Sequence, residues 1–439
     1  MPRILRGAPA QPEIAPTKRF YIMVLMAAVT ALAMTDRNIL SILLVPIKQE
    51  LKVSDTAMGL LTGTAFAVVY ATTAIPLARV ADVGNRRTLL VVCLAVWSGA
   101  TALSGFATSY LQLLVARIGV AGGEAPANPA ITSMIADLYP PERRATALGA
   151  ILIGLGLGVM FGSVCGGLLA QELGWRAAFF AVGVPGILLA ILIWLTVPEP
   201  LRGGTNGLHE DPDSRSIWLA LRYMMTVPSF LHILSAKTFM QISSQASLIW
   251  APAFLIRVHG LSLAETGLYY GVAIALATFF AAVIGGPISD RLARKGPAGH
   301  LRFCIVSMVL SGPTAVGLAL APSAAWAVAF IFLYGFVSAL NNTASMAGAL
   351  AVVRPQMRGV MTAVVNFVYS LLGAGLGGLI VGLLNDVLEP RYGDQAIRYS
   401  LLIMPVASTI AAVSYYLGSR TLDRDAKRAE SPVYAPPST

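Results

Sequence analysis

Residues 20–46 read FYIMVLMAAVTALAMTDRNILSILLVP, an almost unbroken apolar stretch that holds one aspartate and one arginine. A helix rises about 1.5 Å per residue and needs about 20 residues to cross a bilayer, so this stretch predicts a membrane span. Asp36 and Arg37 lie well inside it, where an ionisable group costs about 2.5–3.5 kcal/mol and marks a working site. Neighbouring positions on a helix point about 100° apart, so each of the two charges requires a partner on another helix.

The composition of the whole chain is that of a membrane protein. Of 439 residues, 56% are hydrophobic and 12% are charged, and the mean hydropathy is +0.72, whereas soluble domains carry about 25% charged residues. The net charge of +10 also suits cytoplasmic loops, which accumulate Lys and Arg, so we expect the lipid bilayer and not nucleic acid as the partner. The cysteines, Cys93, Cys165 and Cys304, lie in apolar stretches without metal-ligand spacing and predict small buried side chains.

Twelve hydrophobic segments, separated by glycine, proline and charged residues, predict an all-α integral membrane protein. They cover residues 20–46, 57–80, 88–107, 110–137, 145–170, 176–197, 229–256, 263–288, 302–321, 324–350, 359–385 and 397–418. The first segment begins like a secretory signal, but its apolar run continues past Ala33, so we expect an uncleaved helix.

The longest polar break, residues 198–215 (PEPLRGGTNGLHEDPDSR), predicts a linker between two six-helix halves. Residues 216–225 (SIWLALRYMM) are apolar but too short to span, which favours an amphipathic helix in the membrane interface. The tail after Gly418 is polar and ends in SPVYAPPST, so we expect it to be disordered. The predicted parts are a cytoplasmic segment 1–19, a first half 20–197, a cytoplasmic linker 198–228, a second half 229–418 and a cytoplasmic tail 419–439.

The distribution of positive charge predicts the orientation of the chain. With the amino terminus inside, the cytoplasmic segments hold 22 of the 31 Lys and Arg residues, and the outer loops hold six. The other three, Arg37, Arg117 and Lys237, lie within predicted spans. Because cytoplasmic loops carry the excess of Lys and Arg, both termini are predicted to be cytoplasmic.

A short motif recurs at the same place in the two halves. Residues 78–87 (ARVADVGNRR) follow the second segment, and residues 286–295 (GPISDRLARK) follow the eighth, 208 residues later. A second echo, Pro140-x-x-Arg143 against Pro355-x-x-Arg358, precedes the fifth and eleventh segments. Two parallel six-helix repeats are typical of secondary transporters, in which the substrate binds between the repeats.

The two copies resemble the signature loop of the major facilitator superfamily, G-x-L-x-D-R-x-G-R-K/R, between helices 2–3 and 8–9. In the first copy Ala78, Val83 and Asn85 replace the first glycine, the arginine and the second glycine. We expect Asn85 to keep the turn, because asparagine tolerates the left-handed conformation. In the second copy Ala293 replaces the second glycine. The resemblance implies twelve transmembrane helices in two pseudo-symmetric halves, with both termini cytoplasmic.

Within that superfamily the chain is most similar to the spinster group, over most of its length. The residues that carry the similarity are Asp36-Arg37, Asp82-x-x-Asn85-Arg86, Ala116-Arg117-x-x-x-x-Gly122-Gly123-Glu124-Ala125 and Trp175-Arg176-x-x-Phe179-x-x-x-Gly183-x-Pro185-Gly186. Spinster proteins of animals are carriers of lysolipids and sphingolipids, and their bacterial relatives are regarded as proton-coupled. Anion–cation symporters share some of these features. The resemblance therefore implies a transporter and leaves the substrate open.

Helix rise places the charges of the first and fourth segments at similar depth. Asp36 lies about 15 Å from the outer end of its span, and Arg117 and Glu124 lie about 10 and 21 Å from the outer end of theirs. Arg117 and Glu124 are seven residues apart and share a helix face. We therefore expect an Asp36–Arg117–Glu124 cluster with Arg37 nearby. A static ion pair that fixes helix packing is the alternative.

The predicted cluster suits proton coupling. Burial favours the protonated carboxylic acid, and a nearby arginine favours the carboxylate. A pair whose spacing changes between inward-open and outward-open states takes up a proton in one state and releases it in the other. We expect Asp36 or Glu124 to be the proton site, with a proton gradient as the energy source and no cofactor or metal.

The signature loops predict a cytoplasmic gate, because their carboxylates and cations can latch the two halves together. Positive-inside topology alone is the alternative explanation for the arginines. The predicted gate residues are Asp82, Arg86, Arg87, Asp290, Arg291, Arg294 and Lys295.

In the fold that the chain resembles, helices 1, 4, 7 and 10 line the central cavity. Lys237 lies about 12 Å from the cytoplasmic end of its helix, where it can contact an anionic head group or snorkel to the interface. For the other polar residues, hydrogen bonds that pack helices are the alternative. The predicted cavity residues are Asn38, Tyr70, Lys237, Gln241, Trp250, Asn341, Asn342, Asn366 and Tyr369.

The fifth segment carries glycines that predict close approach of another helix. They lie at positions 154, 156, 158, 162, 166 and 167. They do not form a nucleotide site, because no strand precedes them and no P-loop lysine follows.

These patterns predict a proton-coupled secondary transporter that works by alternating access on an amphiphilic or lipid-like substrate. A symporter or antiporter of small organic anions, sugar acids or drugs is the alternative. The twofold repeat argues against a passive channel, and an enzyme is disfavoured because the four histidines are scattered without ligand spacing. We expect a monomer in a bacterial inner membrane.

Overall fold

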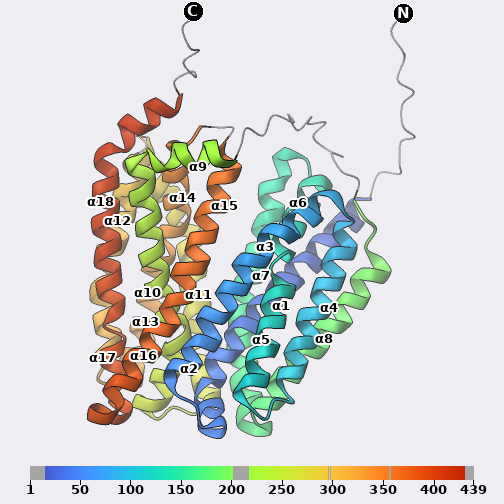
Figure 1. Cartoon of the computed structure of the whole chain (residues 1–439), viewed down its shortest axis with the longest axis vertical. Helices are drawn as coiled ribbons and strands as arrows, with labels where there is room; N and C mark the ends of the chain where they lie inside the picture. Colours follow the sequence, from blue (N-terminus) through green and yellow to red (C-terminus); the bar gives the residue numbers. More distant parts are fainter. Residues whose placement is uncertain (1–14, 201–216, 295, 297, 355–356, 431–439) are drawn as a thin grey trace, which may run out of the picture.

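The computed structural model describes residues 15–200, 217–294, 296, 298–354 and 357–430, and almost all of these are helical. The helices form two bundles that lie side by side, the first half of the chain in one and the second half in the other (Figure 1). The start of α1 and the end of α18 lie at the same end of the bundles, the upper end in Figure 1. We refer to this end as the terminal end and to the other as the opposite end.

The first half contains eight α-helices and one π-helical turn. They are α1 (Pro16–Leu51), α2 (Asp55–Gly59), η1 (Leu60–Thr64), α3 (Ala65–Val83), α4 (Arg86–Ser104), α5 (Tyr110–Glu124), α6 (Ala127–Leu138), α7 (Pro141–Leu173) and α8 (Trp175–Thr196).

The second half begins with a short helix and then repeats the pattern. Its elements are α9 (Ile217–Met225), α10 (Pro228–His259), α11 (Leu263–Ala293), α12 (Ala298–Ala319), α13 (Ala324–Ala339), α14 (Asn341–Ala351), α15 (Arg358–Val368), η3 (Tyr369–Ala374), α16 (Gly375–Tyr392), η4 (Gly393–Gln395), α17 (Ala396–Ser400) and α18 (Ile403–Glu430).

Each of the twelve predicted segments is helical, although not each is one helix. Ten helical segments among the described residues are long and apolar enough to cross a membrane. The predicted segment 110–137 is divided into α5 and α6 at Pro126, because proline lacks the N–H that would continue the helix. Large apolar side chains are exposed on many of the helices, for example Leu195 and Leu103, as expected for lipid-facing surfaces.

The linker and the tail differ in how well they match expectation. The predicted short helix is present as α9, which lies across the terminal end of the second half (Figure 1); residues 201–216 of the linker lie outside the described residues. The expectation of disorder after Gly418 is wrong up to Glu430, because α18 continues that far. The buried Asp425 side chain accepts hydrogen bonds from the backbone N–H and the hydroxyl of Ser229, at 3.1 and 2.8 Å, and so holds α18 against the first turn of α10.

The hydrophobic cores show where the halves are joined. One cluster contains buried residues of both halves, including Ile39 and Leu43 of α1 with Trp250 and Phe254 of α10. A second cluster belongs to the first half alone, around Trp97, and a third belongs to the second half alone. The two separate clusters include the starts of α1 and α10, which lie toward the terminal end. The halves therefore share a core near the opposite end and keep separate cores toward the terminal end.

Glycine allows two close crossings between the halves. A Cβ at Gly59 would lie 2.5 Å from the carbonyl oxygen of Gly378, where α2 meets α16. Nearby, the Thr64 hydroxyl of η1 donates to the carbonyl oxygen of Gly375 at 2.6 Å. A Cβ at Gly267 of α11 would lie 2.2 Å from the carbonyl oxygen of Ser163 on α7. Both crossings bring backbone against backbone, as small residues do in membrane helix pairs.

The predicted glycine groove of α7 packs against α1. A Cβ at Gly154 or Gly158 would lie 2.5 or 2.2 Å from the carbonyl oxygen of Ala27 or Ala31. Gly156, on another face of the same helix, has nothing within 4 Å of its Cβ position. The close approach therefore depends on the glycines spaced by four residues.

Substitution at these glycines tests the packing of α1 on α7. We expect Gly158→Ala to lower the free energy of unfolding by about 1–3 kcal/mol, because the added methyl group forces two backbones apart. The matched change Gly156→Ala should be neutral or slightly stabilising, since alanine is the better helix former. Thermal unfolding of purified protein in detergent measures both. Equal effects of the two changes would contradict the contact.

Candidate functional site

The two charges of α1 each pair with a residue of α5. The Arg117 guanidinium lies 3.3 Å from the Asp36 carboxylate, and the Arg37 guanidinium lies 2.7 Å from that of Glu124. These are contacts of Arg117 Nη1 with Oδ1 and of Arg37 Nη2 with Oε1. The predicted cluster is therefore assembled, as two ion pairs that link the same two helices.

The Asp36–Arg117 pair is the more enclosed of the two. Both residues are almost fully buried, at 1% and 2% exposure. The second carboxylate oxygen of Asp36 accepts a hydrogen bond from the Thr101 hydroxyl on α4. Asp36 thus has partners for both oxygens. Thr101 was not predicted, because a single threonine in an apolar helix carries no distinguishing pattern.

The Arg37–Glu124 pair is open on one side. The Arg37 side chain is 31% exposed, and its guanidinium carbon lies 4.8 and 4.9 Å from the ring centroids of Phe66 and Tyr70. This geometry is that of a cation–π contact. Glu124 is buried, and its Oε2 atom has no hydrogen-bond partner among the described residues.

Arg37 lines a cavity of about 180 Å³ between the two halves. Residues of α1, η1, α3 and α5 form one wall, and residues of α10 and η3 form the other. A second cavity of about 190 Å³, within the second half, shares part of this lining. The shared residues are Gln241, Gln245, Leu248 and Tyr369.

The structure places the predicted cavity residues in different surroundings. Five of them line one or both of these cavities: Asn38, Tyr70, Gln241, Asn342 and Tyr369.

The other four lie elsewhere. The Trp250 indole donates to the carbonyl oxygen of Gly378 at 2.9 Å and helps to join the halves. Asn341 is buried and accepts a hydrogen bond from Tyr415. For these two residues the alternative of helix packing fits the contacts better. Asn366 is exposed.

Lys237 does not snorkel. It is 7% exposed, and its ammonium nitrogen lies 3.0 Å from the Ser345 hydroxyl oxygen of α14. It also lies 5.6 Å from the ring centroid of Tyr369. The side chain therefore points into the second half and not toward the membrane interface.

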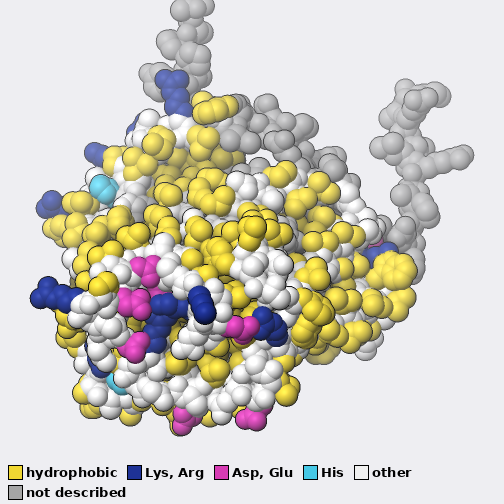
Figure 2. All heavy atoms as spheres, turned by 60° about the horizontal axis from the view of Figure 1, so that its bottom comes forward, with side chains coloured by type: hydrophobic (Ala, Val, Ile, Leu, Met, Phe, Trp, Pro, Cys, Tyr) yellow, Lys and Arg dark blue, Asp and Glu magenta, His cyan; other side chains and the backbone are white. Residues whose placement is uncertain are grey.

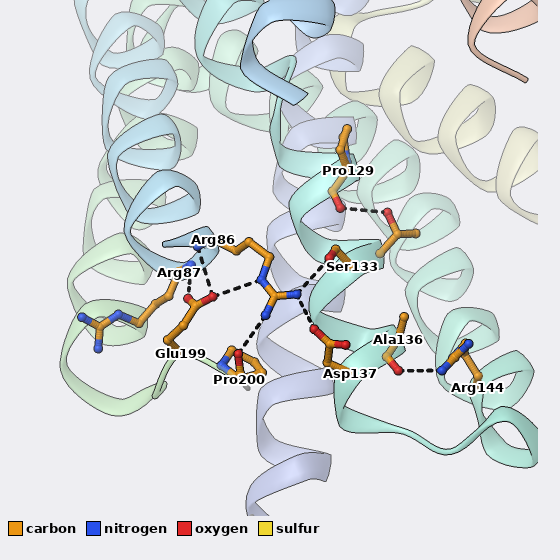
Figure 3. A network of polar contacts seen from close by, with 10 residues as sticks. Arg86, Arg87, Pro129, Ser133, Ala136, Asp137, Arg144, Glu199 and Pro200 are labelled. Atoms are coloured by element: carbon orange, nitrogen blue, oxygen red, sulfur yellow. Dashed lines mark hydrogen bonds and ion pairs between the residues drawn. The ribbon is translucent and has the colours of Figure 1, made fainter. Parts of the chain in front are cut away.

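Arg86 and Arg87 of the predicted gate bind within the first half (Figure 3). The Arg86 guanidinium contacts the carboxylates of Asp137 and Glu199 and the carbonyl oxygen of Pro200. The backbone N–H groups of Arg86 and Arg87, at the start of α4, donate to the Glu199 carboxylate at 3.2 and 2.7 Å. This network ties α4 to α6 and to the chain after α8.

The other gate residues are placed only in part. Arg291 and Arg294 are exposed on the second half. The side chains of Asp82 and Asp290, and residue Lys295, lie outside the described part of the structure. Whether the two loops latch together stays a prediction.

The expected left-handed turn at Asn85 is wrong. Asn85 has φ −76° and ψ 111°, and its side chain accepts a hydrogen bond from the backbone N–H of Thr88 at 2.7 Å. It is the N-cap of α4. An asparagine satisfies one of the free N–H groups at a helix start, which explains the residue without a left-handed conformation.

Sequence analysis also missed a group of charges at the opposite end. The Arg257 guanidinium of α10 binds both carboxylate oxygens of Asp55, at 2.5 and 2.8 Å, and Lys48 binds the same carboxylate at 2.9 Å. The Asp386 carboxylate of α16 accepts from the backbone N–H groups of Asp55 and Thr56, at 2.9 and 2.8 Å. We call these residues the opposite-end clamp. Figure 2 shows acidic and basic side chains gathered on this face.

The clamp joins the two halves. Asp55, at the start of α2, is 1% exposed, and its partners Arg257 and Asp386 come from the other half. Its members lie just outside the predicted spans and are far apart in the sequence. Unless the start of the second segment is known to contact the seventh and eleventh segments, nothing in the sequence connects these residues.

Two helical halves around a cavity that is lined by the arginines of two ion pairs are typical of a secondary membrane transporter. Residues 26–378 match the family model of the Major Facilitator Superfamily. The chain therefore belongs to this superfamily and is a multi-pass membrane transporter, not an enzyme.

Three relatives with different names are similar to this chain along most of its length. An MFS-type efflux pump of Mycolicibacterium smegmatis is 33% identical over 411 residues, which cover 93% of this chain and 95% of the relative. Protein spinster homolog 1 of Rattus norvegicus is 27% identical over 93% of this chain and 82% of the relative. A probable L-galactonate transporter of Escherichia coli is 25% identical over 90% and 87%.

The fold has a similar solved structure. A bacterial homologue of the human lysosomal transporter Spinster, in an inward-facing and unoccupied conformation, superposes with a TM-score of 0.84. It is 28% identical, and the match covers 94% of this chain and 99% of that one. The similarity to the spinster group is thereby confirmed in sequence and in structure.

A double-mutant cycle tests how strongly Asp36 and Arg117 depend on each other. We expect Asp36→Asn to lower the free energy of unfolding by about 3–5 kcal/mol, because it leaves a buried guanidinium unpaired. The double change Asp36→Asn/Arg117→Gln should cost less than the sum of the single changes. The exposed Glu50–Arg176 pair is the matched control, and Glu50→Gln should cost about 1 kcal/mol or less. Additive effects at Asp36 and Arg117, measured by unfolding in mixed micelles, would argue against coupling.

Proposed function

We propose that this protein is a proton-coupled secondary transporter that moves an amphiphilic or lipid-like substrate by alternating access. The observation that carries the proposal is the Arg37–Glu124 ion pair, whose arginine lines a cavity between the two halves. Such a pair connects protonation of a buried carboxylate with the charge that the cavity presents to a substrate. The energy source is a proton gradient, and no cofactor is required.

The proposal includes a topology of twelve spans with both termini in the cytoplasm of a bacterial cell. The excess of Lys and Arg in the predicted inner segments supports this orientation. With it, the terminal end faces the cytoplasm and the opposite end faces outward. The shared core at the opposite end and the separate cores at the terminal end support an inward-open state. We propose that the transporter acts as a monomer in the inner membrane.

Of the two candidate carboxylates, the contacts favour Glu124 as the proton site. Asp36 has partners for both oxygens, and it is enclosed together with Arg117. Glu124 has one oxygen without a partner among the described residues, and its only ion pair is with Arg37, which lines the cavity. Protonation of Glu124 would remove the negative charge beside Arg37 and leave that cation free to attract an anionic group.

The lining of the cavity supports an amphiphilic substrate. It combines the cation Arg37 and the amides of Gln241 and Gln245 with apolar groups such as Phe66 and Ile249. The similarity to spinster proteins supports the same class. The alternative, a small organic anion such as a sugar acid, is supported by the similarity to a probable L-galactonate transporter and by the same arginine.

Uptake into proteoliposomes separates the two substrate classes. We expect an oleoyl lysophospholipid to accumulate when a pH gradient is imposed and to equilibrate without one. Galactonate, tested in parallel, should show no gradient-driven accumulation. Accumulation of galactonate but not of the lipid would favour the alternative, and lipid accumulation that ignores the gradient would contradict proton coupling.

Replacement of Glu124 tests the proton site. We expect Glu124→Gln to reduce gradient-driven accumulation at least tenfold and to leave substrate exchange at equal pH measurable, because glutamine cannot release a proton. Glu50→Gln, an exposed change at the opposite end, is the control. Gradient-driven accumulation at the wild-type level in Glu124→Gln would remove this residue from the mechanism.

We further propose that the opposite-end clamp is the outer gate. It holds the halves together through a bidentate arginine–carboxylate contact, which is among the stronger ionic hydrogen bonds. Outward opening must separate Asp55 from Arg257 and from Asp386.

Weakening the clamp should shift the conformational equilibrium. With spin labels at positions 52 and 391, we expect Asp55→Asn to add a population at longer distance, because the carboxylate that binds Arg257 is lost. The exposed change Glu172→Gln serves as the control. Identical distance distributions for wild type and Asp55→Asn would contradict the gate.

A further inference from the structure

We propose that Lys237 recognises the charge of the substrate's head group, so that the transporter prefers amphiphiles whose head group carries a net negative charge. This inference rests on the function proposed above and specifies its substrate class. The shared chemistry of such head groups is a phosphate or a carboxylate on a single long apolar chain.

The first observation is that Lys237 is a buried cation with no ionic partner in the part of the chain that the structure describes. Its ammonium group is held by the Ser345 hydroxyl at 3.0 Å, and that hydroxyl in turn donates to the carbonyl oxygen of Asn342 at 3.2 Å. Among the described residues it forms no ion pair. Buried charges in proteins are normally paired, because their desolvation is otherwise uncompensated.

The buried cations of the first half, unlike Lys237, are paired with carboxylates. Arg37 and Arg117 are each matched by a carboxylate, so the charges at that site balance. Arg86, also buried, contacts two carboxylates. Lys237 alone among these four cations meets only a neutral hydroxyl and the face of an aromatic ring. The second half therefore presents an uncompensated positive charge.

The second observation is that Lys237 lies next to the cavities. Gln241, which lines both cavities, is one helical turn further along α10 and so shares a face with Lys237. Tyr369, which also lines both, has its ring centroid 5.6 Å from the ammonium nitrogen. An ammonium group has three donors, and Ser345 accepts only one. In the proposed bound state, a change of side-chain rotamer turns the other donors toward an anion beside Tyr369.

The third observation is the apolar surface near this position. Met240, Leu248 and Ile274 line the cavity of the second half together with Gln241 and Tyr369. These apolar groups can contact part of an acyl chain while its head group approaches Lys237. The first-half cations that line the cavity between the halves, Arg37 and Arg117, are paired with Glu124 and Asp36. Lys237 is thus the cation beside the cavities whose charge no carboxylate of the described residues matches.

The test compares three ligands that share an oleoyl chain and differ in head-group charge: lysophosphatidic acid, lysophosphatidylcholine and monooleoylglycerol. The measured quantity is the affinity for lysophosphatidic acid divided by the affinity for each of the two lipids without net charge. These affinities are determined by competition in detergent. We expect a preference of at least tenfold for lysophosphatidic acid in the wild type. Lys237→Gln should reduce this ratio at least tenfold, and Lys237→Arg should retain most of it.

Arg302→Gln, which removes an exposed cation of α12, is the matched control and should leave the ratio unchanged. Thermal unfolding of Lys237→Gln and Lys237→Arg shows whether a reduced affinity ratio is due to unfolding of the variant. If Lys237→Gln unfolds, the ratio measured for Lys237→Arg still tests the inference. A ratio that is the same in the wild type and Lys237→Gln overturns the inference, while binding of all three lipids leaves the proposed function standing. Failure of the wild type to bind any of the three would instead contradict the lipid-like substrate itself.

Discussion

The cost of placing charge inside a membrane organises this structure. Asp36 and Arg37 stand next to each other on one helix, where neither can neutralise the other, and both partners come from α5. That requirement fixes the rotation and depth of α1 against α5, and it places Arg37 on the wall between the halves. The glycines of α7 then allow α1 to be approached closely from its other side. Packing, cavity and charge are in this way consequences of one electrostatic constraint.

Different parts of the structure were predictable for different physical reasons. The helical segments follow from apolar length, and the ion pairs follow from helix rise, because Asp36, Arg117 and Glu124 have depths that can be estimated along straight helices. Contacts made by helix ends escape this kind of reasoning. Asn85 acts through a cap and Asp425 through a hydrogen bond to a helix 196 residues away, so local composition suggested the wrong conformation for both.

The opposite-end clamp and the contacts of Lys237 could not be predicted from the sequence for a related reason. Asp55 and Asp386 are ordinary charges beside predicted spans until the second and eleventh segments are known to cross, and the crossing itself depends on glycine backbone contacts that have no hydrophobic pattern. The sequence shows that Lys237 is a charged residue inside a membrane helix, but it does not show where the side chain points. Only the packing of α14 against α10 shows that the side chain points inward, to Ser345.

The contact between Asp425 and Ser229 bears on how this chain is handled and how it can vary. A polar carboxyl-terminal extension of a membrane protein is ordinarily regarded as dispensable, and residues 419–430 have that composition. Here they form the last turns of α18 and supply the acceptor for the first turn of α10. The same helix carries Lys237, Gln241 and Gln245, and it lines both cavities. Shortening the chain at residue 418 therefore removes a contact that holds the first turn of this helix. Residues 419–430 thus support the helix that lines both cavities, and a fusion partner or tag belongs after residue 430.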